Sequence, residues 1–144
     1  MTRISPPPIN EPIVDGDGNT SLPWILFFNN LWNGDTGDDW TPTFVSMGST
    51  GTPTYTGKIY RIGQRLAYFT ITVTPATDTT STAGTTYCDN FPMTLSSDGA
   101  CLAASGFVGS ETAGMCKSSS NRIYPPAWAA ITVPVTIAGL VEAR

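Results

Sequence analysis

The chain contains no histidine among its 144 residues. Histidine supplies the base of Ser-His-Asp triads and Cys-His pairs, and it is a ligand in most zinc sites. The sequence also lacks the GxxxxGKS/T and GxGxxG motifs, which bind phosphates and dinucleotides. We therefore expect no catalytic residue, no metal site and no cofactor, and we do not expect an enzyme.

Charged side chains are scarce as well. They make up 12% of the chain, and the net charge is -4. No basic patch is present, which argues against nucleic-acid binding. The longest apolar run, WILFF at residues 24–28, is too short to cross a bilayer, and residues 1–10 lack the apolar segment of a signal peptide. We expect neither a nucleic-acid nor a membrane partner.

The three cysteines cannot all pair with one another, and the spacing of Cys88, Cys101 and Cys116 fits no zinc motif. A free cysteine behaves as a small hydrophobic residue and is commonly buried. We therefore predict three buried, reduced thiols in a protein made in a cytoplasm, where disulfides are rare. One intrachain disulfide is the alternative.

Residues 1–19 predict an extended arm. Proline fixes its own φ and pushes the preceding residue toward extended conformations. The prolines of this segment are Pro6, Pro7, Pro8 and Pro12. The segment VDGDGNT at residues 14–20 then predicts a turn, because Asp and Gly adopt the left-handed conformations that a tight reversal needs.

Residues 20–34 predict one short helix that is apolar on nearly all sides. Thr20 or Ser21 can cap its beginning, and Gly34 can close its end. A stripe at helical spacing is formed by Trp24, Phe28, Leu31 and Trp32. Such a helix must be buried against another surface. That surface is either the β-domain of the same chain or a symmetry mate or partner protein, and we favour the second.

Residues 40–144 predict an all-β domain, because short segments rich in Thr, Val, Ile and aromatic residues are separated by turn signals. Residues 66–73 alternate cleanly, and one face consists of Ala67, Phe69, Ile71 and Val73. Seven to eight such segments predict a compact two-sheet sandwich, for which a jelly-roll order is one arrangement. The polar stretch at residues 74–86 is predicted to be a surface loop or an edge.

Two aromatic residues of the segment NRIYPPAW, Tyr124 and Trp128, are candidates for facing a ligand. Pro125 and Pro126 place the segment at a sheet edge or in a loop, and aromatic faces stack well on sugars or partner side chains. The alternative, in which Tyr124 and Trp128 close the core, is at least as well supported.

Two adjacent acids, Asp38 and Asp39, are expected in a turn beside Trp40. Paired acids next to an aromatic ring occur in glycosidases. Adjacent acids in a strand point in opposite directions, however, so we assign them no catalytic role.

The order of these segments resembles small virion proteins of tailed bacteriophages. The resemblance runs through PPPINEPIVDGDGNTSLPWILFFNNLWNG and the Thr-rich segment that begins WTPTFVSM, and then through NRIYPPAW and VPVTIAGLVEAR. It implies virion assembly, frequent trimers, and an N-terminal segment that inserts into the tail or portal-adaptor region. The matching virion-anchor positions are Pro6, Pro7, Pro8, Ile9 and Pro12 in the arm, and Trp24, Phe27 and Phe28 in the helix. We expect the oligomer contacts to be Leu31 and Trp32.

The sequence thus leads us to expect a structural virion protein, either tail-associated or part of a short fibre, made in the host cytoplasm. Its expected partners are other virion proteins, namely a tail adaptor, the portal or the capsid, and further copies of itself, with a trimer favoured. Two alternatives stay open. One is a capsid decoration protein, as in a head fibre or a cement protein, and the other is a receptor- or glycan-binding module.

Overall fold

The computed structural model describes residues 8, 10, 12–14, 16–26, 37–62, 64–105 and 113–144. The chain divides into two compact units, Met1–Thr36 and Gly37–Arg144. The second unit is mostly β-sheet, which confirms the predicted all-β class. The strands in its described residues are Asp38–Trp40 (β1), Phe44–Val45 (β2), Gly48–Thr50 (β3), Thr54–Ile62 (β4), Leu66–Thr74 (β5), Asp78–Ser81 (β6), Tyr87–Cys88 (β7), Gly99–Ser105 (β8), Gly114–Lys117 (β9), Arg122–Tyr124 (β10), Trp128–Ile131 (β11) and Val135–Glu142 (β12).

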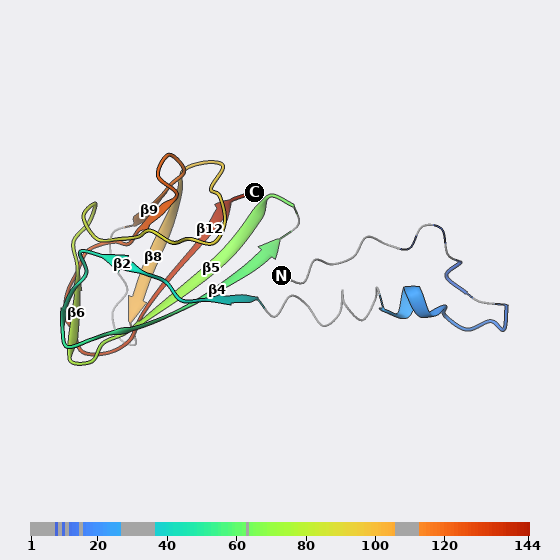
Figure 1. The fold of residues 1–144 in the computed structure, drawn as a ribbon, viewed down its shortest axis with the longest axis horizontal. Helices are drawn as coiled ribbons and strands as arrows, with labels where there is room; N and C mark the ends of the chain where they lie inside the picture. The colour runs from blue at the N-terminus through green and yellow to red at the C-terminus, as the bar shows by residue number, and fades with distance from the viewer. Residues whose placement is uncertain are drawn as a thin grey trace. The chain divides into compact units, whose positions relative to one another are not determined.

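Nine of these strands form a curled sheet in the order β1-β4-β5-β12-β8-β9-β10-β7-β2, and the other three form a smaller sheet in the order β11-β6-β3. The longest strands of the curled sheet, β4, β5, β12 and β8, lie side by side (Figure 1). Strand β5 pairs in antiparallel fashion along its whole length with β4, and along nearly all of it with β12. The jelly-roll order stays a prediction.

The side chains of β5 alternate between core and surface, as the sequence predicts. Its inward face is fully buried and consists of Ala67, Phe69, Ile71 and Val73. Its outward face carries the exposed Leu66 and Tyr68, while the neighbouring β12 buries Val135 and Ile137. Because side chains repeat every second residue, a slip of one residue in register would expose the entire inward face. Burial of this face therefore fixes the pairing of the three central strands.

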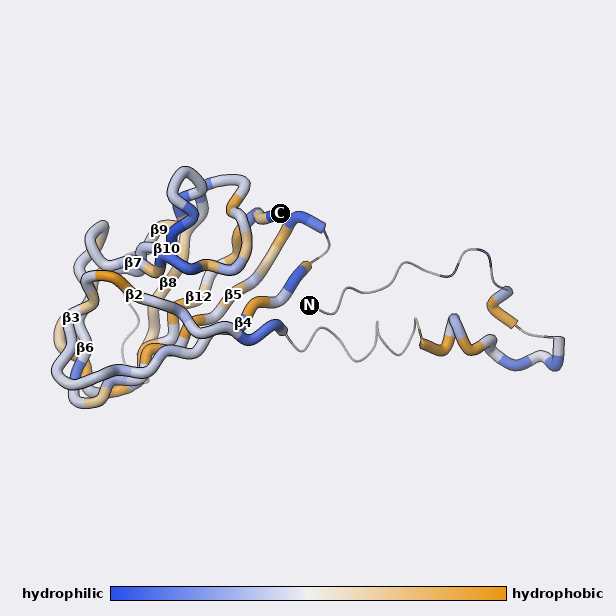
Figure 2. The backbone as a smooth tube through the Cα atoms, viewed as in Figure 1, coloured by the Kyte–Doolittle hydropathy of each residue, from blue (hydrophilic) through white to orange (hydrophobic). Residues whose placement is uncertain are grey.

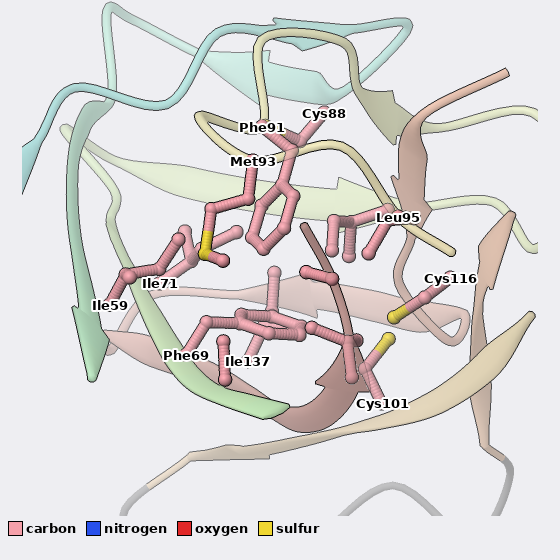
Figure 3. Packing of buried hydrophobic residues seen from close by; sticks show 14 of the residues in the cluster. Ile59, Phe69, Ile71, Cys88, Phe91, Met93, Leu95, Cys101, Cys116 and Ile137 are labelled. Carbon is pink, nitrogen blue, oxygen red and sulfur yellow. The ribbon is translucent and has the colours of Figure 1, made fainter. Parts of the chain in front are cut away.

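An irregular segment between β7 and β8 closes the core. Its buried side chains alternate as in a strand and are Phe91, Met93 and Leu95. The ring of Phe91 makes an edge contact with the ring of Phe69, with 5.4 Å between centroids (Figure 3). It makes a second edge contact with Trp40 at 5.8 Å. Aromatic pairs in this geometry add stabilisation beyond their buried area.

Two aromatic rings lie over a glycine of the neighbouring strand. Phe69 is paired with Gly139 of β12, and Trp40 is paired with Gly57 of β4. A methyl group on Gly139 would lie 2.8 Å from Cε1 of Phe69 and 2.9 Å from the carbonyl oxygen of Ala100. A methyl group on Gly57 would lie 2.5 Å from the ring of Trp40. The ring occupies the space that a side chain on the paired strand would need.

The polar stretch at residues 74–86 contains a strand, and the prediction of a loop or an edge was wrong. Strand β6 is the central strand of the smaller sheet, between β11 and β3. Its Thr79 and Ser81 side chains are buried. Thr is favoured in strands because its branched side chain packs well on a pleated surface. No large apolar residue marks this strand in the sequence, and for that reason the prediction missed it.

Asp38 and Asp39 also lie in a strand, not in the predicted turn. They belong to β1, the edge strand that pairs with β4 through Asp38↔Ile59 and Asp39↔Lys58. The ammonium nitrogen of Lys58 lies 3.3 Å from Oδ1 of Asp39. Charged side chains suit such an edge because they discourage its pairing with a foreign strand.

The described part of the first unit contains the predicted turn. Val14 and Thr20 form an isolated antiparallel bridge across it. Gly18 adopts a φ of 82° between them, a left-handed conformation that glycine reaches without steric strain. The turn predicted at residues 14–20 is therefore confirmed.

A helix follows the turn over residues 22–26. The N–H groups of Trp24 and Ile25 each donate to the carbonyl oxygen of Ser21 at 3.0 Å, so the helix begins after Ser21. The hydroxyl of Ser21 donates to the carbonyl oxygen of Pro12 at 2.6 Å. Residues 27–34 of the predicted helix, and most of the predicted arm, lie outside the described residues.

Replacing Gly139 by Ala should lower the free energy of unfolding by about 1–3 kcal/mol, because the new methyl group would overpack against Phe69. Gly99→Ala is the matched control in the adjacent strand β8, where a methyl group meets its nearest neighbour at 3.6 Å. The control should change stability little. Urea denaturation of both variants gives the comparison, and equal free energies of unfolding would contradict the packing described here.

Candidate functional site

The predicted virion anchor lies in the first unit. Of its residues, Pro8, Pro12 and Trp24 are described, with Pro12 exposed and the other two half-buried. The remaining predicted anchors and oligomer contacts lie outside the described residues. They are Pro6, Pro7, Ile9, Phe27, Phe28, Leu31 and Trp32.

The described part of the first unit exposes large apolar side chains. Leu22 and Leu26 of the helix are 66% and 54% exposed. Figure 2 shows this helix as an apolar segment that follows a hydrophilic turn. The unit also exposes Ile13, Val14 and Ile25. Exposed apolar surface of this kind is typical of a site that contacts another macromolecule.

A second candidate surface lies on the outer side of β7, β9 and β10, where two tyrosines and two cations meet. The ring centroids of Tyr87 and Tyr124 are 5.4 Å apart. The guanidinium carbon of Arg122 lies 4.1 Å from the centroid of the Tyr87 ring, and the ammonium nitrogen of Lys117 lies 5.6 Å from that of Tyr124. Both distances are within the range of cation–π attraction. We call these four residues the Tyr–Arg cluster.

Strand pairing brings the Tyr–Arg cluster together. Arg122 is paired with Lys117 across β10 and β9. Ile123, between Arg122 and Tyr124, is fully buried, so its two neighbours point outward. Ile123 is also paired with Cys88 of β7, which brings the preceding Tyr87 beside Tyr124.

Side-chain hydrogen bonds fix both ends of the turn between β9 and β10. Asn121 adopts a φ of 55°, and its side-chain oxygen accepts a 2.8 Å hydrogen bond from the N–H of Leu95. Asn reaches this left-handed conformation more readily than most residues. Oδ1 of Asp98 accepts hydrogen bonds from the N–H and the hydroxyl of Ser118 at 2.8 and 2.7 Å. These bonds fix the hairpin that carries Arg122.

The cluster changes the acidity of its own side chains. A hydrogen bond from Arg122, together with one from Ser120 and the nearby positive charges of Arg122 and Lys117, lowers the pKa of Tyr124 below its ordinary value of about 10. The same bond to Tyr124 raises the pKa of Arg122. The site therefore favours negative charge at the phenol oxygen, and its two cations are suited to meeting an anionic group.

Trp128, the other residue predicted to face a ligand, is not part of this cluster. It lies in β11 of the smaller sheet, opposite Ser81, and packs against the hydrophobic core. Pro125 and Pro126 are fully buried and carry the chain from one sheet to the other. Tyr124 thus faces outward, whereas Trp128 forms part of the core wall.

Arg122 and Lys117 were not predicted as site residues. The alternation Arg-Ile-Tyr at residues 122–124 is the one local signal, because it places Arg122 and Tyr124 on the same side of a strand. Lys117 and Tyr87 come from two other strands. Their approach depends on pairing between distant segments, which local periodicity does not reveal.

The three cysteines are free and buried, which confirms the predicted thiols. Cys101 and Cys116 lie on the adjacent strands β8 and β9, and their sulfur atoms point toward one another (Figure 3). A hydrogen bond with Cys116, together with burial, raises the pKa of Cys101, and burial raises the pKa of Cys88. Raised pKa values keep Cys88 and Cys101 protonated at neutral pH and poorly nucleophilic.

Within the described residues, no three side chains of the types that bind metals lie together. In the same part of the chain, no helix has the length and apolar character needed to span a membrane. Comparisons with protein-family models, with curated proteins and with solved structures found no match.

Titration of the tyrosines with rising pH should show one phase that ionises below the ordinary tyrosine range. This phase belongs to Tyr124, because Arg122 stabilises its phenolate. Tyr124→Phe should remove the phase, and Arg122→Gln should move it to higher pH, as followed by tyrosinate absorbance. Tyr55→Phe is the control, because burial raises the pKa of Tyr55, so the early phase should persist. An early phase that Arg122→Gln leaves in place would contradict the assigned hydrogen bond.

Proposed function

We propose that this protein is a structural virion protein of a tailed bacteriophage, a tail-associated or short-fibre component attached to the particle by its N-terminal arm and helix. The β-domain is proposed to be a compact sandwich displayed on the particle as a homo-oligomer, with a trimer favoured. The proposed partners are the tail adaptor, the portal or the capsid. The resemblance carried by the sequence and the division of the chain into two compact units support this proposal.

The observation that carries the proposal is the exposed apolar surface of the first unit. Leu22 and Leu26 are four residues apart and lie on one side of the helix, where 66% and 54% of their surface is exposed. Burying one such side chain fully is worth roughly 1.5–3 kcal/mol. A partner that covered this side would therefore gain substantial affinity from few residues, as in other complexes that seat an amphipathic helix in a groove.

The second unit has its own complete core. Every described residue of the buried hydrophobic cluster belongs to this unit, from Ile59 to Ala143. Leu22 and Leu26 of the first unit are exposed. This arrangement supports a β-domain that folds by itself and an N-terminal segment used for attachment.

Deleting residues 1–36 should leave the β-domain folded but abolish its incorporation into particles. The full chain and the deletion variant would be expressed with an affinity tag in infected cells, and purified particles would be analysed by mass spectrometry. We expect the full chain in the particles and the deletion variant only in the soluble fraction. Circular dichroism should show a cooperative melting transition for both.

A paired substitution refines this test. Leu22→Ser combined with Leu26→Ser should reduce incorporation, whereas Thr52→Ser combined with Thr82→Ser, at exposed positions of the second unit, should not. Normal incorporation of the deletion variant would show that the arm and helix are not the anchor.

The Tyr–Arg cluster favours a second candidate function, recognition of an acidic glycan on the host surface. Arg122 and Lys117 offer donors to a carboxylate, sulfate or phosphate group, and Tyr87 and Tyr124 border them with aromatic surface. Hydrogen bonds from cations to such anions are stronger than those between neutral groups. A rigid hairpin that carries the cations lowers the cost of ordering them on binding.

Binding to an array of acidic and neutral glycans tests this second function. Arg122→Ala should weaken binding to acidic glycans about tenfold or more, which corresponds to about 1.4 kcal/mol. Arg65→Ala is the matched control, because Arg65 is exposed and pairs with Glu142 on another part of the sheet. Absence of glycan binding by the full chain would remove this candidate.

A further inference from the structure

The long strands of the curled sheet expose large apolar side chains on the side opposite to the core. Side chains alternate along a strand, so the residues between the buried ones point outward. We call the outward-pointing side chains of β4, β5, β12 and β8 the outer sheet face. Its large apolar members, 39% to 60% exposed, are Ile62, Leu66, Tyr68, Leu102 and Leu140.

Strand register makes this face continuous. Tyr68 is paired with Tyr60 on one side and with Leu140 on the other. The two tyrosine rings lie 5.9 Å apart between centroids. Leu102 is paired with Ala138, two residues before Leu140 on the same side of β12. The exposed apolar side chains therefore form one patch across four strands instead of isolated contacts.

The rest of the outer sheet face consists largely of threonine. One row across the sheet pairs Thr56 with Thr72 and Thr72 with Thr136. These side chains are short, branched and uncharged, so the face has no long flexible side chains there to order on contact. Ordering few rotamers keeps the entropic cost of association low.

The charges on this face are neutralised within the chain. Lys58 lies 3.3 Å from Asp39, and Arg65 lies 2.6 Å from Glu142. A second copy of the chain presents the same charges, so self-association requires a face that does not repel itself. The two internal ion pairs meet that requirement. A partner that bound through opposite charge would find these charged side chains already paired within the chain.

The size of the face also suits a contact between copies. Strands lie about 4.8 Å apart, and outward side chains lie about 6.7 Å apart along each strand. With five outward positions on each of β4 and β5, four on β12 and three on β8, the face covers roughly 550 Å² in projection. An interface of standard size takes about 800 Å² of accessible surface from each partner. The composition, with Tyr and Leu at the centre and charges at the margin, is that of an interface core.

We propose that the outer sheet face is the surface by which copies of this chain associate. The contact surrounds Tyr68 and Leu140, and it is separate from the attachment of the first unit to a particle. The predicted oligomer contacts Leu31 and Trp32 belong to the first unit. The proposal therefore places the main contact between copies in the β-domain.

Analytical ultracentrifugation of the full chain tests this proposal. The full chain should sediment as an oligomer, and Leu140→Lys should raise the dissociation constant about tenfold or more, because it places a charge in an apolar interface. Thr52→Lys, at an exposed position outside the outer sheet face, is the matched control and should leave the oligomer intact. Leu22→Lys, in the proposed anchor, tests whether the first unit contributes to the contact. Leu102→Lys repeats the test at a second exposed position, in case Leu140→Lys does not fold by circular dichroism.

Three results would overturn the proposal. The full chain could sediment as a monomer at micromolar concentrations, or both face substitutions could leave the oligomer unchanged. Dissociation by Leu22→Lys alone would place the contact in the first unit. If the chain is monomeric and Leu140→Lys lowers its incorporation into particles, the face contacts another virion protein instead of a second copy. If a face substitution abolished the oligomer but left incorporation into particles normal, the contact between copies and the proposed anchor would be two distinct sites.

Discussion

Burial of one face of β5 is the constraint on which the rest of the structure depends. The strand pairs along its length with β4 and β12, and its inward residues have no exposed surface. Phe69 is central to this face because its ring contacts Phe91 from the closing segment and lies over Gly139 of β12. The register of the three strands follows from these contacts, since a slip of one residue would turn the face toward water. The position of every outward side chain on these strands then follows as well.

That constraint explains where the molecule exposes apolar surface. Among the described residues, the large exposed apolar side chains fall into two groups, one in the first unit and one on the outer side of the curled sheet. Leu22 and Leu26 represent the first group, and Leu140 and Met115 the second. Burial of exposed apolar surface is favourable, and the proposals made above assign each group a contact with another molecule.

Much of this fold could be predicted from the sequence, because its central strands follow a local rule. The alternation at residues 66–73 gave the buried and exposed faces correctly, and the turn at residues 14–20 followed from its Asp and Gly content. Strand β6 was missed because Thr79 and Ser81 are buried without being apolar. The Tyr–Arg cluster was only partly predictable, since it joins residues from three strands whose register depends on the whole sheet. Local patterns indicate which way a side chain points, but not which distant strand lies next to it.

The central claim is that the chain is a tail-associated component of a virion. The most direct measurement is its copy number in purified particles, obtained by quantitative mass spectrometry against the major capsid protein. A tail-associated or short-fibre protein should be present at a few to a few tens of copies, in a multiple that reflects its symmetry. Hundreds of copies would place it on the capsid shell as a decoration protein and contradict the proposed location. Absence from particles would contradict the virion function itself.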